Sequence, residues 1–396
     1  MRTTDALRRA FRTELVVEIA QSLIRVPTEN PPGNESAIVP TLRRWLDLIG
    51  ARDVTVLTPE QGRTSLLATC GNPGDKRLIW NGHIDVVPAG DRQTWRNAPF
   101  EALVSEGNVW GRGAADMKGP IASALAALAT IRDAGISLHG ELTIQLVADE
   151  ETGGELGTKF LHDRGLLAPA DGAICGEPTG LSAVTAAKGL QWLTITVHGQ
   201  SAHASRPSDG VNAISQLATV LQALGKLGFE DLTHPLLGQP TLAPTMVLGG
   251  TKANVVPDRT VLTLDCRLLP GQRRSDIPDR VRKVLRSLDE SDGIEATLSE
   301  LAFWEPSEVD PSALIVTAAR AATENILGRR PEIAGMTGST DARFLIQAGV
   351  PTLLFGPGQL REAHTANESI AIEDLKEGAL AYAATFCEFL GASDQS

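Results

Sequence analysis

Short apolar segments alternate with helical segments in the first half of the chain, and this alternation constrains the fold more than any other feature. Segments 77–80, 141–147 and 172–175 have the length and apolar character of buried strands, and segments 119–134 and 155–164 are typical of helices. Strands that alternate with helices predict a parallel or mostly parallel sheet whose two faces are covered. We therefore expect an α/β domain.

A second, smaller domain interrupts this pattern. Segment 191–198 alternates strictly between apolar and polar residues, as expected for a half-buried strand. It starts the order strand, helix, strand, strand, helix, strand, which is the order of ferredoxin-like α+β sandwiches. The α/β pattern then returns in the last part of the chain. The predicted domain bounds are 1–180 and 295–396 for the α/β domain and 181–294 for the insertion.

Composition excludes several classes of protein. The net charge is −12, with 36 basic against 48 acidic residues, which opposes a nucleic-acid-binding surface. Apolar stretches stay well short of about 18 residues, so no transmembrane helix is expected. Glu14 and Glu18 stand where a signal peptide needs an apolar segment, and the 4 cysteines are scattered singly. We expect a cytoplasmic protein that binds neither nucleic acid nor membrane.

Polar clusters that contain histidine or carboxylates follow the predicted strands or lie in the loops between them. Because ligands of an open α/β sheet bind beyond the carboxyl ends of its strands, we expect these clusters to meet although the chain separates them. Each cluster by itself has an ordinary interpretation, since an acidic pair can be a solvated strand end and an aspartate a turn residue. Together they indicate one site. The clusters are His83 with Asp85, Asp116, Glu150 with Glu151, and Glu177.

A divalent cation explains why such groups would gather. Carboxylates that lie together repel and raise one another's pKa unless a cation neutralises them. Imidazole and carboxylate ligands without thiolate suit zinc, with cobalt or manganese as alternatives. Zinc lowers the pKa of a bound water to about 7, and a free carboxylate nearby can then take the proton. Neighbouring side chains in extended backbone point in different directions, so Glu150 and Glu151 can divide these two tasks.

Motifs of competing enzyme classes are absent from the sequence, which has no G-x-x-x-x-G-K-[ST] loop, no G-x-S-x-G elbow and no H-E-x-x-H pair. The segments that carry the polar clusters instead resemble the M20 metallopeptidase family, in order and spacing and over nearly the whole chain. They look more like the branch of acetylornithine deacetylase and succinyl-diaminopimelate desuccinylase than like the peptidases. The segments are 82–88, 113–119, 176–179 and 363–368.

The resemblance implies two divalent metal ions, zinc first, that are held by five residues. Asp116 would bridge the two ions, and Asp85 would orient the ring of His83 without binding a metal ion itself. Glu150 would be the general base. No ligand position departs from the family pattern. The implied metal ligands are His83, Asp116, Glu151, Glu177 and His364.

The inserted domain resembles the lid and dimerisation domain of the family, which implies a homodimer. His203 would reach, from the partner subunit, the oxygen that becomes negative in the tetrahedral intermediate. Asn254 and Arg267 match positions that contact substrate, although Arg267 can instead form a salt bridge to a neighbouring strand. The loop with Ser339 and Thr340 either contacts substrate or caps a helix.

The resemblance implies a hydrolase with a small-molecule substrate. The first expectation is hydrolysis of the amide bond of an N-acyl amino acid, of the deacetylase or desuccinylase type. A metal-bound water would attack the carbonyl carbon, with Glu150 as the base. The alternative within the family is a dipeptidase or carboxypeptidase acting on short peptides. The fold expected overall is a mostly parallel-sheet hydrolase domain interrupted by a ferredoxin-like lid.

Overall fold

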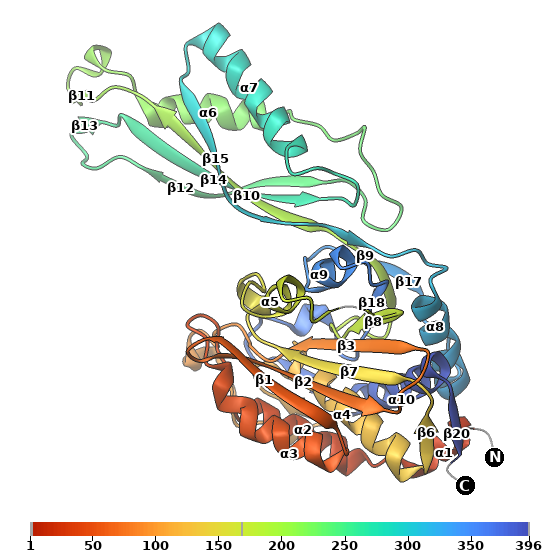
Figure 1. Cartoon of the computed structure of the whole chain (residues 1–396). Helices are drawn as coiled ribbons and strands as arrows, with labels where there is room; N and C mark the ends of the chain where they lie inside the picture. Colours follow the sequence, from red (N-terminus) through yellow and green to blue (C-terminus); the bar gives the residue numbers. More distant parts are fainter. Residues whose placement is uncertain (1–2, 168, 395–396) are drawn as a thin grey trace. The chain divides into compact units, whose positions relative to one another are not determined.

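A computed structural model describes residues 3–167 and 169–394 of the chain, which divides into two compact units (Figure 1). The larger unit comprises Met1–Thr185, Glu308–Ala334 and Thr340–Ser396. The smaller unit comprises Ala186–Ser307 and Gly335–Ser339. The larger unit is therefore assembled from segments that lie on both sides of the smaller unit in the sequence.

The larger unit contains a mixed sheet with the strand order β1-β2-β7-β3-β8-β18-β9. Its central strands β7, β3, β8 and β18 are parallel, whereas β1, β2 and β9 pair antiparallel with their neighbours. The predicted α/β fold with a large, mostly parallel sheet is confirmed. The strands are β1 (Arg52–Glu60), β2 (Arg63–Gly71), β3 (Arg77–His83), β7 (Glu141–Val147), β8 (Gly172–Cys175), β9 (Ala183–Ala187) and β18 (Thr352–Leu354).

Helices cover both faces of this sheet (Figure 1). On one face α4 contacts α2 and α10, and α10 contacts α8. On the other face α5 and α9 contact each other, and Phe344 of α9 lies in one apolar cluster with Ile79 and Val147 of the sheet. Both faces of the central strands are thus withdrawn from water. The helices are α2 (Thr13–Ile24), α4 (Lys118–Asp133), α5 (Thr158–Asp163), α8 (Leu314–Leu327), α9 (Ala342–Gln347) and α10 (Ile372–Leu390).

The smaller unit is an antiparallel sheet with the strand order β12-β14-β10-β15. Apolar residues of its two helices, such as Leu217 and Val281, form one core with Ile195 and Leu264 of the sheet. The order along the chain, β10-α6-β12-β14-α7-β15, is that of a ferredoxin-like sandwich. The elements are β10 (Gly189–His198), α6 (Ala213–Leu224), β12 (Thr241–Gly249), β14 (Arg259–Leu268), α7 (Asp276–Asp292) and β15 (Ala296–Trp304).

The last of these strands, β15, lies in the smaller unit. It pairs with β10 along nearly its whole length, for example through Ile195 and Leu298. The predicted strand order counts this strand as the last one of the insertion, whereas the predicted bound at 294 lies in front of it. The division into 1–180, 181–294 and 295–396 stays a prediction.

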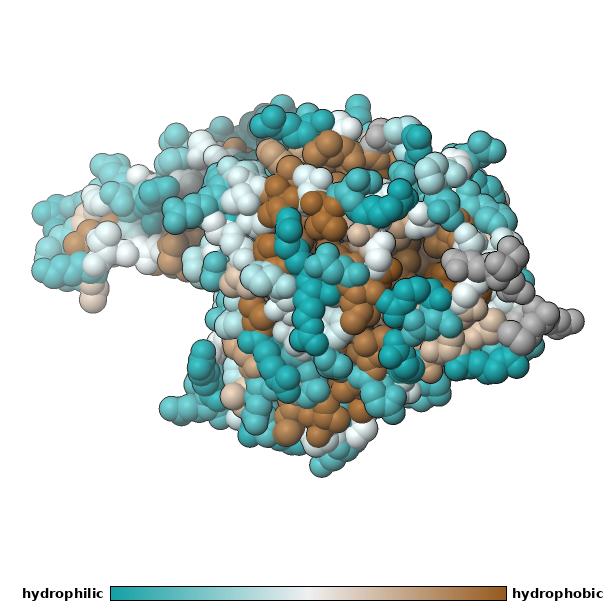
Figure 2. Space-filling model, turned by 60° about the horizontal axis from the view of Figure 1, so that its bottom comes forward, coloured by the Kyte–Doolittle hydropathy of each residue, from teal (hydrophilic) through white to brown (hydrophobic). Residues whose placement is uncertain are grey.

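The remaining elements are short or lie at the margins. Figure 2 shows one face of the molecule, on which apolar side chains are broken up by hydrophilic ones. Within residues 3–167 and 169–394, no helix combines the length and apolar character needed to cross a membrane. The elements are α1 (Thr3–Ala10), α3 (Val39–Leu48), β4 (Leu103–Ser105), β5 (Asn108–Trp110), β6 (Ile136–Leu138), β11 (Ala202–His203), β13 (Val255–Val256), β16 (Ser307–Glu308), β17 (Ile333–Met336), β19 (Ser369–Ala371) and β20 (Ala392–Asp394).

The core of the smaller unit gives a stability prediction. Ile195 is fully buried between the sheet and its helices. We expect Ile195→Ala to lower the free energy of unfolding by about 2–5 kcal/mol, because it leaves a cavity in a packed core. Chemical denaturation followed by circular dichroism measures this loss. Ser299→Ala, at an exposed position of β15, should change stability by less than about 0.5 kcal/mol. Equal effects of the two substitutions would contradict the assignment of this core.

Candidate metal and active site

The carboxyl ends of the parallel strands bring the predicted site residues together. His83 is the last residue of β3, and it pairs in register with Val147 at the end of β7. Glu150 and Glu151 follow β7 in a short 3-10 turn, Glu150–Thr152. Glu177 follows β8, and Asp116 precedes α4. The chain separates these residues, and the parallel register aligns them at one edge of the sheet.

Three of the predicted ligands form a compact cluster. Single ligand atoms of His83, Asp116 and Glu151 all lie within 4.8 Å of one another. Nε2 of His83 lies 2.9 Å from Oδ1 of Asp116. His364 joins from the loop after η5 (Leu360–Glu362), with its Nε2 3.4 Å from Oδ2 of Asp116 and 3.1 Å from Oε2 of Glu151. Asp116 therefore lies between the two imidazoles, one on each carboxylate oxygen.

Two further glutamates add negative charge to the same place. Burial, followed by the charge of Asp116, raises the pKa of Glu177 to about 8. Burial also raises the pKa of Glu150 well above its usual value, and the charges of Glu177 and Glu151 add to this shift. The electrostatic interactions thus link Glu150 and Glu177 to the cluster around Asp116. Among the described residues, the group of ligand atoms within 4.8 Å of one another includes neither Glu150 nor Glu177.

The two histidines respond to this excess of negative charge. Burial by itself lowers the pKa of His83, but hydrogen bonds with Asp116 and Asp85 outweigh it and raise the pKa well above its usual value. Hydrogen bonds with Asp116 and Glu151 raise the pKa of His364 to about 10. The carboxylates thus favour positive charge at this place. A divalent cation would supply such charge, so the described residues fit such an ion.

Asp85 holds the backbone of the site. Its Oδ1 accepts a hydrogen bond from the backbone N–H of Glu150, and its Oδ2 accepts one from that of Glu151, both at 3.2 Å. Nδ1 of His83 lies 2.9 Å from the backbone oxygen of Asp85 and 3.6 Å from its carboxylate. The backbone oxygen is thus the nearer partner of the imidazole. Orientation of His83 by the Asp85 carboxylate stays a prediction.

Sequence reasoning missed the residues that support the cluster from behind. Glu368 is fully buried and accepts hydrogen bonds from the backbone N–H groups of Ala115 and Asp116, at 2.9 and 3.0 Å. Its other oxygen pairs with Arg112 at 2.6 Å. Glu368 stands within the segment that carries His364, but its partners lie far away in the sequence. The one signal in the sequence was the position of Glu368 in the same segment as the predicted ligand His364.

The predicted substrate contacts of the smaller unit have local partners. Arg267 forms two hydrogen bonds to Asp265, Nε to Oδ1 at 2.7 Å and Nη2 to Oδ2 at 3.1 Å. A salt bridge was the open alternative for this arginine, although its partner lies on the same strand and not on a neighbouring one. His203 is exposed, with its Nδ1 2.7 Å from Oγ of Ser205. The backbone oxygen of Asn254 accepts a hydrogen bond from Ala204.

The loop with Ser339 and Thr340 leads into α9. Ser339 belongs to the smaller unit, and Thr340 to the larger. The helix begins after Asp341, whose side chain makes no capping hydrogen bond. Asp341 is instead buried and accepts a hydrogen bond from Thr158 at 2.6 Å, and its charge is one of those that raise the pKa of Glu150. Asp341 is therefore a neighbour of the site that sequence reasoning did not single out.

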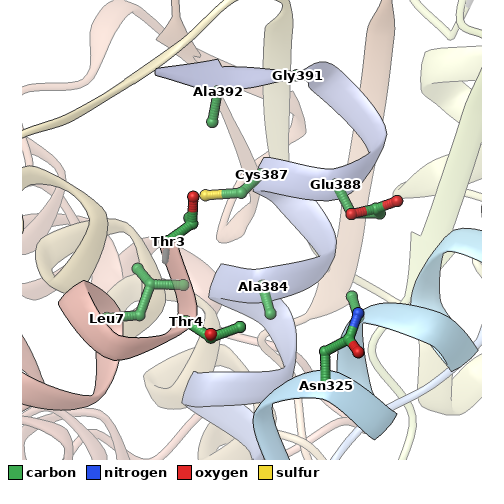
Figure 3. Close-up of a pocket in the computed structure, with 10 residues that line it drawn as sticks. Thr3, Thr4, Leu7, Asn325, Ala384, Cys387, Glu388, Gly391 and Ala392 are labelled. Carbon is green, nitrogen blue, oxygen red and sulfur yellow. The ribbon is translucent and has the colours of Figure 1, made fainter. Parts of the chain in front are cut away.

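A separate groove of about 290 Å³ lies among α1, α8 and α10 (Figure 3). Thr3, Leu7, Asn325 and Cys387 are among its lining residues. Burial raises the pKa of the Cys387 thiol to about 12, so this cysteine is not a nucleophile at neutral pH. The groove holds none of the metal-ligand candidates, and we assign no chemistry to it.

Comparison with known proteins agrees with this geometry. Residues 79–388 match the family described as Peptidase family M20/M25/M40. Succinyl-diaminopimelate desuccinylase of Caulobacter vibrioides is 30% identical, over 95% of this chain and 96% of that protein. N-formyl-4-amino-5-aminomethyl-2-methylpyrimidine deformylase of Halalkalibacterium halodurans is 28% identical, over 91% of each chain.

Solved structures show the same fold. The aminopeptidase PepT from Bacillus cereus superposes with a TM-score of 0.81 at 22% identity, over 96% of this chain and 99% of that one. A dinuclear metal-binding peptidase of the M20 family from Bacillus subtilis superposes with a TM-score of 0.71 at 18% identity, over 96% and 99% of the chains. At such identities the likeness establishes the fold, and the substrate needs other arguments.

The cluster predicts a loss of cation affinity when one ligand is removed. We expect His83→Ala to weaken binding of Zn²⁺ or Co²⁺ by roughly tenfold or more, because it removes an imidazole from the group around Asp116. Isothermal titration calorimetry on the apoprotein measures the affinity. His139→Ala is the matched control, since His139 is exposed and its Nε2 lies beside Ser393. Unchanged affinity in His83→Ala would remove this histidine from the site.

Proposed function

Because the chain belongs to peptidase family M20/M25/M40, we propose that it hydrolyses the amide bond of an N-acyl amino acid, as a deacetylase or desuccinylase does. The observation that carries this proposal is the meeting of His83, Asp116 and Glu151 beside Glu150, whose charge acts on His83. The similarity to a desuccinylase along almost the whole chain supports the substrate class. The deformylase also removes an acyl group from nitrogen, as its name states.

We propose two divalent cations at this site, with zinc first and cobalt or manganese as alternatives. When bound, such ions would acidify a water molecule and polarise the scissile carbonyl group. Asp116 is suited to bridge them, since its two oxygens already face different imidazoles. The proposed ligands are His83, Asp116, Glu151, Glu177 and His364.

Glu150 would move the protons of the reaction. Desolvation raises the pKa of its carboxylate well above the usual value, which favours acceptance of a proton. It would take a proton from the attacking water and pass it to the nitrogen of the leaving amine. The new C–O bond forms first and gives a tetrahedral intermediate. The C–N bond then breaks as the nitrogen receives the proton, which leaves a carboxylic acid and a free amine.

The smaller unit would supply the remaining contacts. We assign the partner subunit's His203 to the negative oxygen of the intermediate and Arg267 to a substrate carboxylate, for which its planar fork is suited. Binding of that carboxylate would compete with Asp265, which occupies the same donors. Asn254, Ser339 and Thr340 are proposed substrate contacts as well. A cytoplasmic location remains part of the proposal.

Removal of the base tests the mechanism. We expect Glu150→Ala to lower kcat by about 10²–10⁴-fold, because general acid–base catalysis is lost while the cluster of ligands stays intact. Metal content by elemental analysis and unfolding by circular dichroism should match the wild type. Glu155→Ala, at an exposed position of the same segment, is the control and should retain full activity. Near-native hydrolysis by Glu150→Ala would contradict the assignment of Glu150 as the general base.

A substrate panel separates the proposal from the alternative within the family. N-acetyl and N-succinyl amino acids are compared with dipeptides, each with added zinc, cobalt or manganese. Faster turnover of dipeptides would favour a dipeptidase or carboxypeptidase. Hydrolysis that resists EDTA would contradict the metal mechanism for either class.

We also propose a homodimer that forms through β12. This strand is an edge of its sheet, and Met246, Val247 and Leu248 are 58%, 55% and 66% exposed. An exposed apolar edge strand is a template for pairing with another chain. We expect Val247→Lys to give monomers in sedimentation equilibrium. Leu301→Lys, on the opposite edge strand β15 and 60% exposed, should leave the dimer intact. A monomeric wild type would overturn this proposal.

A further inference from the structure

A buried ion cluster lies behind the turn that carries Glu150 and Glu151. Arg63, at the start of β2, forms two hydrogen bonds to Glu35, Nε to Oε2 at 2.9 Å and Nη2 to Oε1 at 2.8 Å. The same Nη2 donates to Oδ1 of Asp149 at 2.7 Å. All three side chains are buried, with Glu35 fully so. One guanidinium thus joins β2 and the segment before α3 to the residue immediately before Glu150.

Asp149 has a backbone conformation that few residues adopt without support. Its φ is 75°, in the left-handed region, which aspartate tolerates better than most residues. Its Oδ1 accepts a hydrogen bond from Thr152 at 2.6 Å, and its Oδ2 accepts one from the backbone N–H of Leu156 at 3.0 Å. Its backbone oxygen accepts from Gly154 at 2.7 Å. The side chain therefore fixes the direction in which the chain enters Glu150 and Glu151.

Asn30 connects this cluster to the other support of the turn. Its Nδ2 lies 2.9 Å from Oδ2 of Asp85 and 3.3 Å from Oδ1 of Asp149. Asp85 in turn accepts the backbone N–H groups of Glu150 and Glu151. The turn is thus held at its amides by Asp85 and at its preceding residue by Asp149. Asn30 and Arg63 link these two supports to the rest of the larger unit.

We infer that Arg63 and Asp149 are positioning residues, which hold the turn so that Glu150 faces the water and Glu151 faces the cation. The inference rests on the function proposed above, because it assigns those two tasks to the glutamates. Successive side chains divide two tasks only when the backbone between them has one fixed conformation. A rotation at Asp149 would turn both carboxylates together and remove the base and a ligand at once.

A structural role alone would have a different signature. If the ion cluster only stabilised the fold, its loss would lower the unfolding temperature and leave kcat and cation affinity of the folded enzyme unchanged. A positioning role predicts a loss in both quantities, with little change in KM. These readouts separate the two roles in protein that is shown to be folded at the assay temperature.

The test compares Arg63→Met and Asp149→Gly with their conservative counterparts, Arg63→Lys and Asp149→Asn. Glycine permits the left-handed backbone but lacks the side-chain hydrogen bonds, so Asp149→Gly isolates them. We expect both disruptive variants to lower kcat by about 10–100-fold, since small misplacements of catalytic groups have effects of this size. Co²⁺ affinity by calorimetry should fall by about 10-fold or more, and the visible spectrum of the Co²⁺ enzyme should change.

Asp149→Asn and Arg63→Lys should recover most of the lost kcat and affinity, because each keeps a hydrogen-bonding group in place. Ile326→Ala, in α8 and buried, is the stability control, because it weakens the core without touching the turn. Losses no larger than those of Ile326→Ala would overturn the inference. So would disruptive variants within about twofold of wild-type kcat and Co²⁺ affinity.

Two outcomes keep this test distinct from that of the proposed function. If the wild type hydrolyses no substrate of the panel, the proposed function fails, and Co²⁺ affinity and spectrum still report whether the turn positions Glu151. If one disruptive variant does not fold, the disruptive variant at the other residue decides by the same criteria, because Arg63 and Asp149 belong to the same ion cluster.

Discussion

Mutual repulsion of carboxylates at the carboxyl edge of four parallel strands is the constraint on which the rest of the structure depends. Asp116 and Glu177 are buried there beside the partly buried Glu150 and Glu151, and like charges withdrawn from water repel strongly. Burial and this repulsion raise the pKa of Glu150 and Glu177, and the carboxylates raise the pKa of His364. A compensating cation would stabilise the ionised form of such a cluster.

Such a cluster also needs a framework that does not yield to the repulsion. Polar groups behind the ligands supply it, since Glu368 holds the backbone of Asp116 and Asp85 holds that of the glutamate turn. Arg63 and Asp149 extend the same framework to β2. None of these groups needs to contact substrate. Their fixed hydrogen bonds convert a crowded edge of a sheet into a site with defined directions.

Much of the fold could be predicted from the sequence, because the strand and helix patterns of the larger unit are local. The strand that ends at His83 and the helix at 119–134 appear nearly where periodicity places them. The pairing of β15 with β10 shows the limit of that reasoning. The local pattern assigns the last strand to the insertion, but its pairing partner lies about a hundred residues away in the chain. The same limit hid Glu368 and Arg63, whose partners are distant in the chain.

The sequence by itself determined the classes of residue at the strand ends, and with them a site of imidazole and carboxylate. It also determined the family, because the motifs stand in order along the chain. Only the tertiary structure decided which carboxylate oxygen faces which histidine, and that Arg267 is paired with Asp265 in this state. The sequence specifies the residue types, whereas distances of a few ångströms between side chains follow from the packing of the whole unit.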